Sequence, residues 1–184
     1  MLFIHIISTE DTNDFATIYS GFENDENTRI LINPTKSECK RAIIDEKERI
    51  VFIGHGTEWG LLNQRLDGFM VGSDMVQFLR GKDIIGIWCY AGNFASRYDL
   101  TGFFTSMFIS NRQELIDNIP IVDYSDEEIM CENRRFATRI NELLHEQTPS
   151  SEWQEILQSE LSQTSPEFVF FNYEAMCSIT ESEL

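Results

Sequence analysis

The chain has 184 residues, of which 42% are hydrophobic and 12% aromatic, and its formal net charge at pH 7 is −17. A chain of this length usually forms one domain, so we expect a single domain over residues 1–184. The acidic balance disfavours nucleic acid and anionic membranes, because both bind proteins through clustered Lys and Arg. No stretch approaches the roughly 18 consecutive apolar residues of a membrane helix. Residues 1–5 lack a basic leader and a cleavage site, so we expect a cytoplasmic protein.

The cysteines and histidines show no spacing typical of a metal site or of a disulfide framework. Cysteine stands at positions 39, 89, 131 and 177, without a Cys-x-x-Cys pair, and histidine at positions 5, 55 and 145. Zinc sites and thioredoxin-type redox sites need more closely spaced ligands or thiols. We therefore expect no metal, no cofactor and no disulfide.

Six short runs rich in apolar, β-branched and aromatic residues are the expected strands. They are residues 2–7, 30–32, 50–53, 84–88, 119–122 and 168–171. Most are continuously apolar, which is typical of strands in a parallel sheet that is covered on both faces. The sequence thus predicts a three-layer α/β fold, with a mostly parallel six-stranded sheet and helices on both faces.

Helical patterns separate these runs. Thr35 and Ser125 are each followed three residues later by a glutamate, which is the spacing of a capping box. Further helices are expected over residues 73–81, 102–109 and 148–163. Residues 56–72 should form a β-hairpin that turns at Asp67-Gly68 and overhangs one edge of the sheet. Residues 8–29 are polar, and we expect a loop there or a short helix around residues 15–19.

Two of the expected strands end in residues that carry chemistry. In residues 50–56, an apolar strand is followed by His55 between two glycines. In residues 83–92, an apolar strand is followed by Cys89 and then by small residues. In open α/β sheets, ligands bind beyond the carboxyl ends of the strands. If these consecutive strands are neighbours, His55 and Cys89 lie together at that edge.

A cysteine beside a histidine is suited to nucleophilic catalysis. The thiolate is the reactive form, and an imidazole can take the thiol proton and later donate it to a leaving amine. A helix that starts after Cys89 would further favour negative charge there. The backbone N–H groups of Gly56 and Cys89 are the candidate donors to a developing oxyanion.

These residues resemble the caspase-like (clan CD) cysteine peptidases, which include caspases, legumain, gingipains, clostripain, separase and CHAT domains. The resemblance is carried by an apolar strand ending in His55-Gly56, then an apolar strand ending in Cys89, with Gly92 three residues later. In motif style it is closest to the CHAT, gingipain and legumain types. The resemblance implies a caspase-like fold over roughly residues 2–122, with His55 as general acid/base and Cys89 as nucleophile. It also implies Gly56 as an oxyanion contributor and a peptide or protein as substrate.

Other residues are candidates for a pocket that holds the substrate side chain. Asp99 and Asp123 each follow an expected element near the site, where a carboxylate would select Arg or Lys; a helix cap or a solvated acid is the simpler interpretation. Trp59, on the expected hairpin, is the third candidate. His5 is expected in the core and His145 at a helix C-terminus, where structural roles suffice.

The sequence therefore predicts a cysteine endopeptidase with a His55–Cys89 dyad. The alternative is a catalytically inactive caspase-like module with a binding or regulatory role, which Trp88 before the cysteine and the short chain favour. A third interpretation is a thiol hydrolase or transferase that does not act on peptides, built on a flavodoxin-like sheet. A small closed pocket and a different strand order would favour that interpretation.

Overall fold

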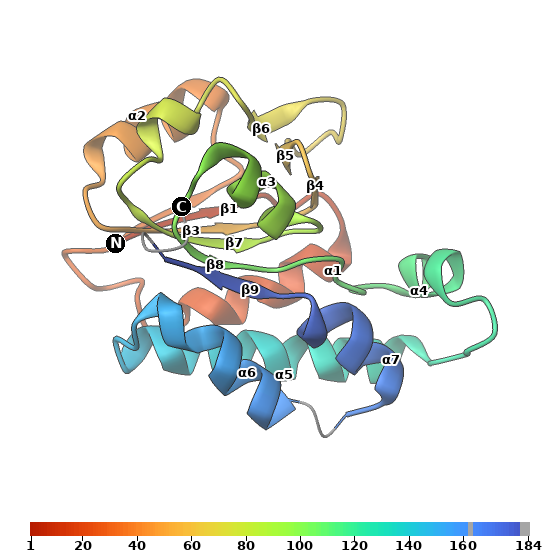
Figure 1. Cartoon of the computed structure of the whole chain (residues 1–184). Helices are drawn as coiled ribbons and strands as arrows, with labels where there is room; N and C mark the ends of the chain where they lie inside the picture. The colour runs from red at the N-terminus through yellow and green to blue at the C-terminus, as the bar shows by residue number, and fades with distance from the viewer. Residues whose placement is uncertain (162–163, 181–184) are drawn as a thin grey trace.

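The computed structural model describes residues 1–161 and 164–180. Its centre is a six-stranded sheet in the order β2-β1-β3-β7-β8-β9 (Figure 1). The strands are β1 (Leu2–His5), β2 (Arg29–Ile32), β3 (Arg49–Ile53), β7 (Asp83–Ile87), β8 (Gly102–Phe104) and β9 (Cys177–Ile179). All neighbours are parallel except β8 and β9, which are antiparallel. The mostly parallel α/β sheet predicted from the sequence is confirmed.

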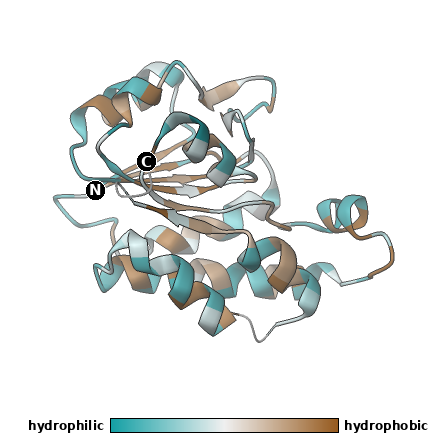
Figure 2. Ribbon diagram, viewed as in Figure 1, coloured by the Kyte–Doolittle hydropathy of each residue, from teal (hydrophilic) through white to brown (hydrophobic). Residues whose placement is uncertain are grey.

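Helices cover both faces of the sheet and complete three layers (Figure 1). One face carries the 3₁₀ helix η1 (Asp14–Tyr19), α5 (Asp126–His145), α6 (Trp153–Leu161) and the π-helix η4 (Val169–Glu174). The other face carries α2 (Lys36–Asp45), α3 (Ala91–Tyr98) and a small second sheet. Successive strand residues point to opposite faces, so the continuously apolar strands supply both cores. Figure 2 shows these apolar strands between helices whose outer surfaces are hydrophilic.

Both expected capping boxes are present. The Thr35 hydroxyl accepts from the Glu38 N–H at the start of α2, and the Ser125 hydroxyl accepts from the Glu128 N–H at the start of α5. Each glutamate side chain accepts in return from the backbone N–H of its capping residue. These local patterns were sufficient because each cap is closed within three residues of sequence.

Two of the six expected strands were wrong. Residues 119–122 lie in the connection between α4 (Arg112–Asn118) and α5, where Ile121 is 92% exposed. Residues 168–171 belong to the helical turns α7 (Pro166–Phe168) and η4, which begin with a proline at the first helical position. The sixth strand is instead β9, close to the C-terminus.

The expected helix over residues 102–109 was also wrong, because this run begins with β8. Gly102 has a φ of +134°, and a Cβ there would lie 1.9 Å from the Ile84 carbonyl oxygen. Glycine thus permits the close approach of β8 to β7, and short apolar runs do not distinguish a strand from a buried helix.

The remaining segments match the sequence in part. Residues 56–72 form three antiparallel strands, β4 (Gly56–Thr57), β5 (Gly60–Leu62) and β6 (Phe69–Val71), where we expected a two-stranded hairpin. The expected helix over residues 73–81 is only the 3₁₀ turn η2 (Val76–Phe78). Residues 10–19 do form short helices, α1 (Glu10–Asn13) and η1. The 3₁₀ turn η3 (Ser150–Glu152) precedes α6, and the expected helix end at Gln163 lies outside the described residues.

Within the described part of the chain, no helix combines the length and apolar character that crossing a membrane requires.

Candidate active site

The register of two central strands places His55 and Cys89 beside each other. β3 and β7 are parallel neighbours in which Ile53 is paired with Ile87. His55 and Cys89 follow these residues at the same interval, so both stand just beyond the carboxyl edge of the sheet. Because side chains alternate between faces, both lie on the side of Ile53 and Ile87, toward the core under α5. The two side chains line one cavity.

The glycines that flank His55 are required by close contacts. Gly54 has a φ of +151°, and a Cβ there would be 2.9 Å from the Ile6 carbonyl oxygen. A Cβ on Gly56 would be 2.0 Å from Cδ1 of Trp88. At Gly56, the indole of Trp88 occupies the space that a side chain would fill.

Trp88 is a core residue on the opposite face from Cys89. It is 3% exposed and makes edge-to-face contacts with Phe52 and Phe94. Its Nε1–H donates to the Thr57 carbonyl at 3.3 Å, which ties β4 to the end of β7. Trp88 therefore does not cover the site from outside.

Cys89 is held in a tight turn between β7 and α3. Tyr90 has a φ of +65°, a left-handed conformation that costs a residue with a side chain about 1–3 kcal/mol. Backbone bonds hold this turn, because the Tyr90 N–H donates to the Ser106 carbonyl at 3.0 Å. The buried Thr105 hydroxyl accepts from the Trp88 N–H at 3.1 Å and donates to the Trp88 carbonyl at 2.8 Å. The N-terminus of α3 follows directly, which favours negative charge at Cys89.

The cavity beside Cys89 is small. Its volume is about 20 Å³, which is room for about one water molecule. The Cys89 thiol donates to the Phe108 carbonyl, with Sγ and O 3.5 Å apart. Besides His55 and Cys89, the cavity is lined by Thr12, Phe15, Gly54, Ile87, Trp88, Phe108 and Ser110. A substrate side chain does not fit inside it, so a peptide would have to bind across the outer rim.

Two residues that the sequence did not reveal contact the imidazole of His55. The Thr9 hydroxyl, from the segment after β1, is 2.7 Å from Nε2. The Glu114 carboxylate, from α4, has its Oε1 3.8 Å from Nδ1, and the side chains of His55 and Glu114 are only 17% and 21% exposed. The Ser110 N–H and hydroxyl donate to the other carboxylate oxygen of Glu114 at 2.8 and 2.9 Å.

One sequence signal would have located α4. Asn111 precedes Glu114 by three residues, and its side chain accepts from the Glu114 N–H at 3.0 Å as the N-cap. Nothing in the sequence, however, connects this helix with His55, because the contact depends on the path of the chain after β8.

The two expected oxyanion donors, the backbone N–H groups of Gly56 and Cys89, lie in different backbone settings. Gly56 faces Leu61 across β4 and β5, and the adjacent bond runs from the Leu62 N–H to the His55 carbonyl at 2.9 Å. This pattern makes Gly56 a non-hydrogen-bonded pair, so its N–H does not take part in the β4–β5 ladder. Cys89 is located at the turn before α3.

The three candidates for a substrate pocket do not line the cavity. Asp99 follows the last residue of α3, at the end of that helix away from Cys89. Asp123 lies between α4 and α5 and forms an exposed ion pair with Arg112 at 2.7 Å. Trp59, between β4 and β5, has the Arg97 guanidinium 3.7 Å from its ring centroid. These positions result from the lengths of α3, α4 and the β4–β5 turn, which sequence proximity to the site does not reveal.

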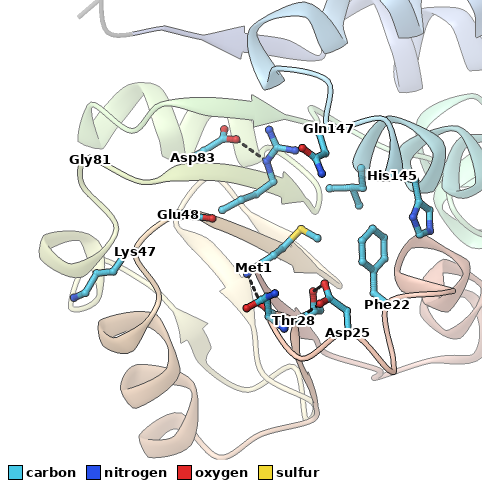
Figure 3. A pocket seen from close by; sticks show the side chains of 13 residues that line it. Met1, Phe22, Asp25, Thr28, Lys47, Glu48, Gly81, Asp83, His145 and Gln147 are labelled. Carbon is cyan, nitrogen blue, oxygen red and sulfur yellow. Dashed lines mark hydrogen bonds and ion pairs between the residues drawn. The ribbon is translucent and has the colours of Figure 1, made fainter.

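The other two histidines have structural surroundings. His5 is fully buried at the end of β1, where Nε2 is 2.8 Å from the Thr12 carbonyl oxygen, and burial lowers its pKa to about 4. His145 stacks on Phe22 with ring centroids 4.1 Å apart. It borders a larger hollow at the opposite edge of the sheet (Figure 3). There, Arg49 and Asp83 form an ion pair at 2.6 Å.

No family of known proteins, no curated protein and no solved structure matches this chain.

Proposed function

We propose that this protein is a cysteine peptidase of the caspase-like type, with Cys89 as nucleophile and His55 as general acid/base. One observation carries the proposal: these two residues stand at the same interval beyond the ends of neighbouring parallel strands, and both line the same cavity. The tight turn at Tyr90 and the start of α3 support it, because both are features that expose and activate a nucleophile.

In the proposed reaction, the Cys89 thiol proton passes to His55 and the sulfur attacks the peptide carbonyl carbon. The carbonyl π electrons move to oxygen, and backbone N–H groups stabilise the resulting oxyanion. When the oxyanion collapses, the C–N bond breaks and the amine leaves with the proton from His55. Water then attacks the thioester as His55 takes its proton, and the acid product leaves as the thiol of Cys89 is restored.

The position of Thr9 bears on which imidazole nitrogen reacts. Because the Thr9 hydroxyl contacts Nε2 at 2.7 Å, we assign the proton exchange with Cys89 to Nδ1. This requires a neutral His55 that carries its proton on Nε2 and donates it to the Thr9 oxygen. The substrate is proposed to be a peptide or protein, and a reducing compartment such as the cytoplasm suits the thiol.

The proposal is tested by labelling with iodoacetamide and with an acyloxymethylketone, with the alkylated residue identified by mass spectrometry. We expect Cys89 to react at least about tenfold faster than an ordinary thiol at pH 7, because His55 increases its thiolate fraction. Cys39 and Cys131 are internal references: Cys39 is buried, with its pKa raised to about 12 by burial, and Cys131 is exposed. Cys89→Ala should remove the fast phase, and His55→Ala should slow it to the rate of Cys131.

Cleavage of a peptide library by the wild-type protein completes the test. Fast labelling together with cleavage supports a peptidase. Fast labelling without cleavage would indicate a thiol enzyme for a smaller substrate. If Cys89 is labelled no faster than Cys131, the proposal that the protein is an enzyme is wrong.

A second candidate function is a non-catalytic binding module. The small cavity favours it, because a volume of about 20 Å³ does not admit a substrate side chain and the Cys89 thiol already donates to the Phe108 carbonyl. The same labelling experiment distinguishes the two candidates, since such a module predicts a Cys89 rate that His55→Ala leaves unchanged.

A further inference from the structure

Glu114 is a partly buried carboxylate beside the proposed acid/base. Its Oε1 is 3.8 Å from Nδ1 of His55, and its Oε2 accepts from both the backbone and the hydroxyl of Ser110. The Ser110 segment is itself fixed, because the Asn133 side chain donates to the Ser110 carbonyl at 2.8 Å. The carboxylate is thus held beside the imidazole by its surroundings, with a limited choice of rotamers.

We propose that Glu114 is a positioning residue that stabilises the imidazolium form of His55, so that the reacting unit is Cys89, His55 and Glu114 together. The inference rests on the proposed function and extends it by a third residue. At 3.8 Å the carboxylate is too distant for a hydrogen bond to Nδ1, so it acts through its charge.

The charge of Glu114 matters in the first step of the reaction. When the Cys89 proton moves to Nδ1 of His55, the sulfur keeps the bonding electrons and the imidazole becomes a cation. Thr9 bonds the other ring nitrogen but carries no charge to offset that cation. Glu114 carries a negative charge on the Nδ1 side, and low exposure limits the screening of its field by water.

Several groups face His55, and they define what a test must control. Thr9 approaches from the segment after β1, Cys89 from the turn after β7, and Glu114 from α4. Of these three residues, Cys89 and Glu114 titrate. Cys89→Ala removes the thiol, so the titration of His55 in this background reports the effect of Glu114.

The first experiment is an NMR titration of the His55 ring in Cys89→Ala, compared with Cys89→Ala/Glu114→Gln. Glutamine can accept the Ser110 bonds but carries no charge, so the fold around α4 is retained. We expect the titration midpoint of His55 to fall by about one pH unit in the double variant, because a nearby carboxylate favours the imidazolium. An unchanged midpoint would overturn the proposal.

The second experiment measures the iodoacetamide rate of Cys89 at pH 7 with an intact thiol. Glu114→Gln should lower this rate about tenfold, since one pH unit in the imidazolium equilibrium corresponds to a factor of about ten. Glu114→Asp, which keeps the charge on a shorter side chain, should restore part of the rate. Asp117→Asn is the matched control: it removes an exposed carboxylate from the same helix and should leave the rate unchanged.

The two proposals fail in different ways. If Cys89 is slow in the wild type but the His55 midpoint still moves with Glu114→Gln, the peptidase proposal fails and the coupling stands. If Cys89 is fast in both the wild type and Glu114→Gln, the dyad stands and Glu114 has no role in it. A rate lost equally in Glu114→Gln and Glu114→Asp, with an unchanged midpoint, would indicate a merely structural residue and overturn the inference.

Discussion

The two ends of β3 and β7 carry very different polar pairs. At the amino ends, Arg49 and Asp83 face each other in register and form an ion pair at 2.6 Å. Two further side-chain bonds link this pair to one nearby segment: Asp83 accepts from the Ser150 hydroxyl at 2.5 Å, and Arg49 donates to the Thr148 carbonyl. At the carboxyl ends, His55 and Cys89 contact groups from three separate segments: Thr9, Phe108 and Glu114.

This difference separates a structural pair of residues from the pair that we propose to be catalytic. The charges at the amino end neutralise each other, and their bonds connect the sheet to the turn before α6. At the carboxyl end, a thiol and an imidazole share a cavity and each contacts a different loop. The same two strands thus carry a structural ion pair at their amino ends and a candidate reaction site at their carboxyl ends. This is expected because loops gather at the carboxyl edge of a parallel sheet.

The largest expected effect is at the carboxyl end. Cys89→Ser should lower peptide cleavage at least about 10³-fold, because the hydroxyl is a far poorer nucleophile without a matched base. The free energy of unfolding in urea should change by less than about 1 kcal/mol, since the substitution alters one atom of a half-buried side chain. If Cys89→Ser greatly lowered the free energy of unfolding but left cleavage intact, Cys89 would be a structural residue and not the nucleophile.

The second effect concerns His5, which ends the strand next to β3. Burial lowers its pKa to about 4 from an unfolded value near 6.5, so the folded state favours the neutral ring. The contribution of the neutral His5 ring to the free energy of unfolding is therefore fully present above about pH 6.5. It is lost as the pH falls toward 4, by about 3 kcal/mol in total. Urea unfolding of the wild type and His5→Gln across this range should show that the variant lacks this part of the pH dependence.

Gly56→Ala should destabilise the fold by about 1–3 kcal/mol, because the added Cβ would overlap Cδ1 of Trp88. Thermal unfolding measures this loss, and a Trp88→Ala background should remove only part of it, because the Cβ would also lie 2.8 Å from the Gly60 carbonyl oxygen. Gly68→Ala is the matched control in the same small region, because its Cβ would meet only Asn63 Nδ2, at 3.4 Å. Equal effects of the two substitutions would show that Trp88 does not fill the space beside His55.

The smallest effect is expected at the amino end. A double-mutant cycle with Arg49→Met and Asp83→Asn should give a coupling energy of about 1 kcal/mol, since the pair is partly exposed and water screens it. Labelling of Cys89 should be unchanged in all three variants. A change in the Cys89 rate would show that the two ends of the strands are coupled.

Local sequence patterns predicted the structure correctly where the interacting residues lie within a few positions of each other. The capping boxes at Thr35 and Ser125 depend on a glutamate three residues away, and both are present. The apolar runs of β1, β3 and β7 were equally clear, because both faces of these central strands are buried. On the β8–β9 side of the sheet the same reasoning failed, since β8 and the helices near residue 170 have similar apolar composition.

The sequence by itself determined the α/β class and the two strand-end residues, His55 and Cys89, because buried parallel strands and flanking glycines leave a local pattern. Only the tertiary structure decided what surrounds them. Thr9 and Glu114 reach His55 from opposite directions along the chain, and Asp99, Asp123 and Trp59 lie away from the cavity. The physical reason is that a contact between distant segments depends on how helices and loops of given lengths pack, and no short stretch of sequence records that packing.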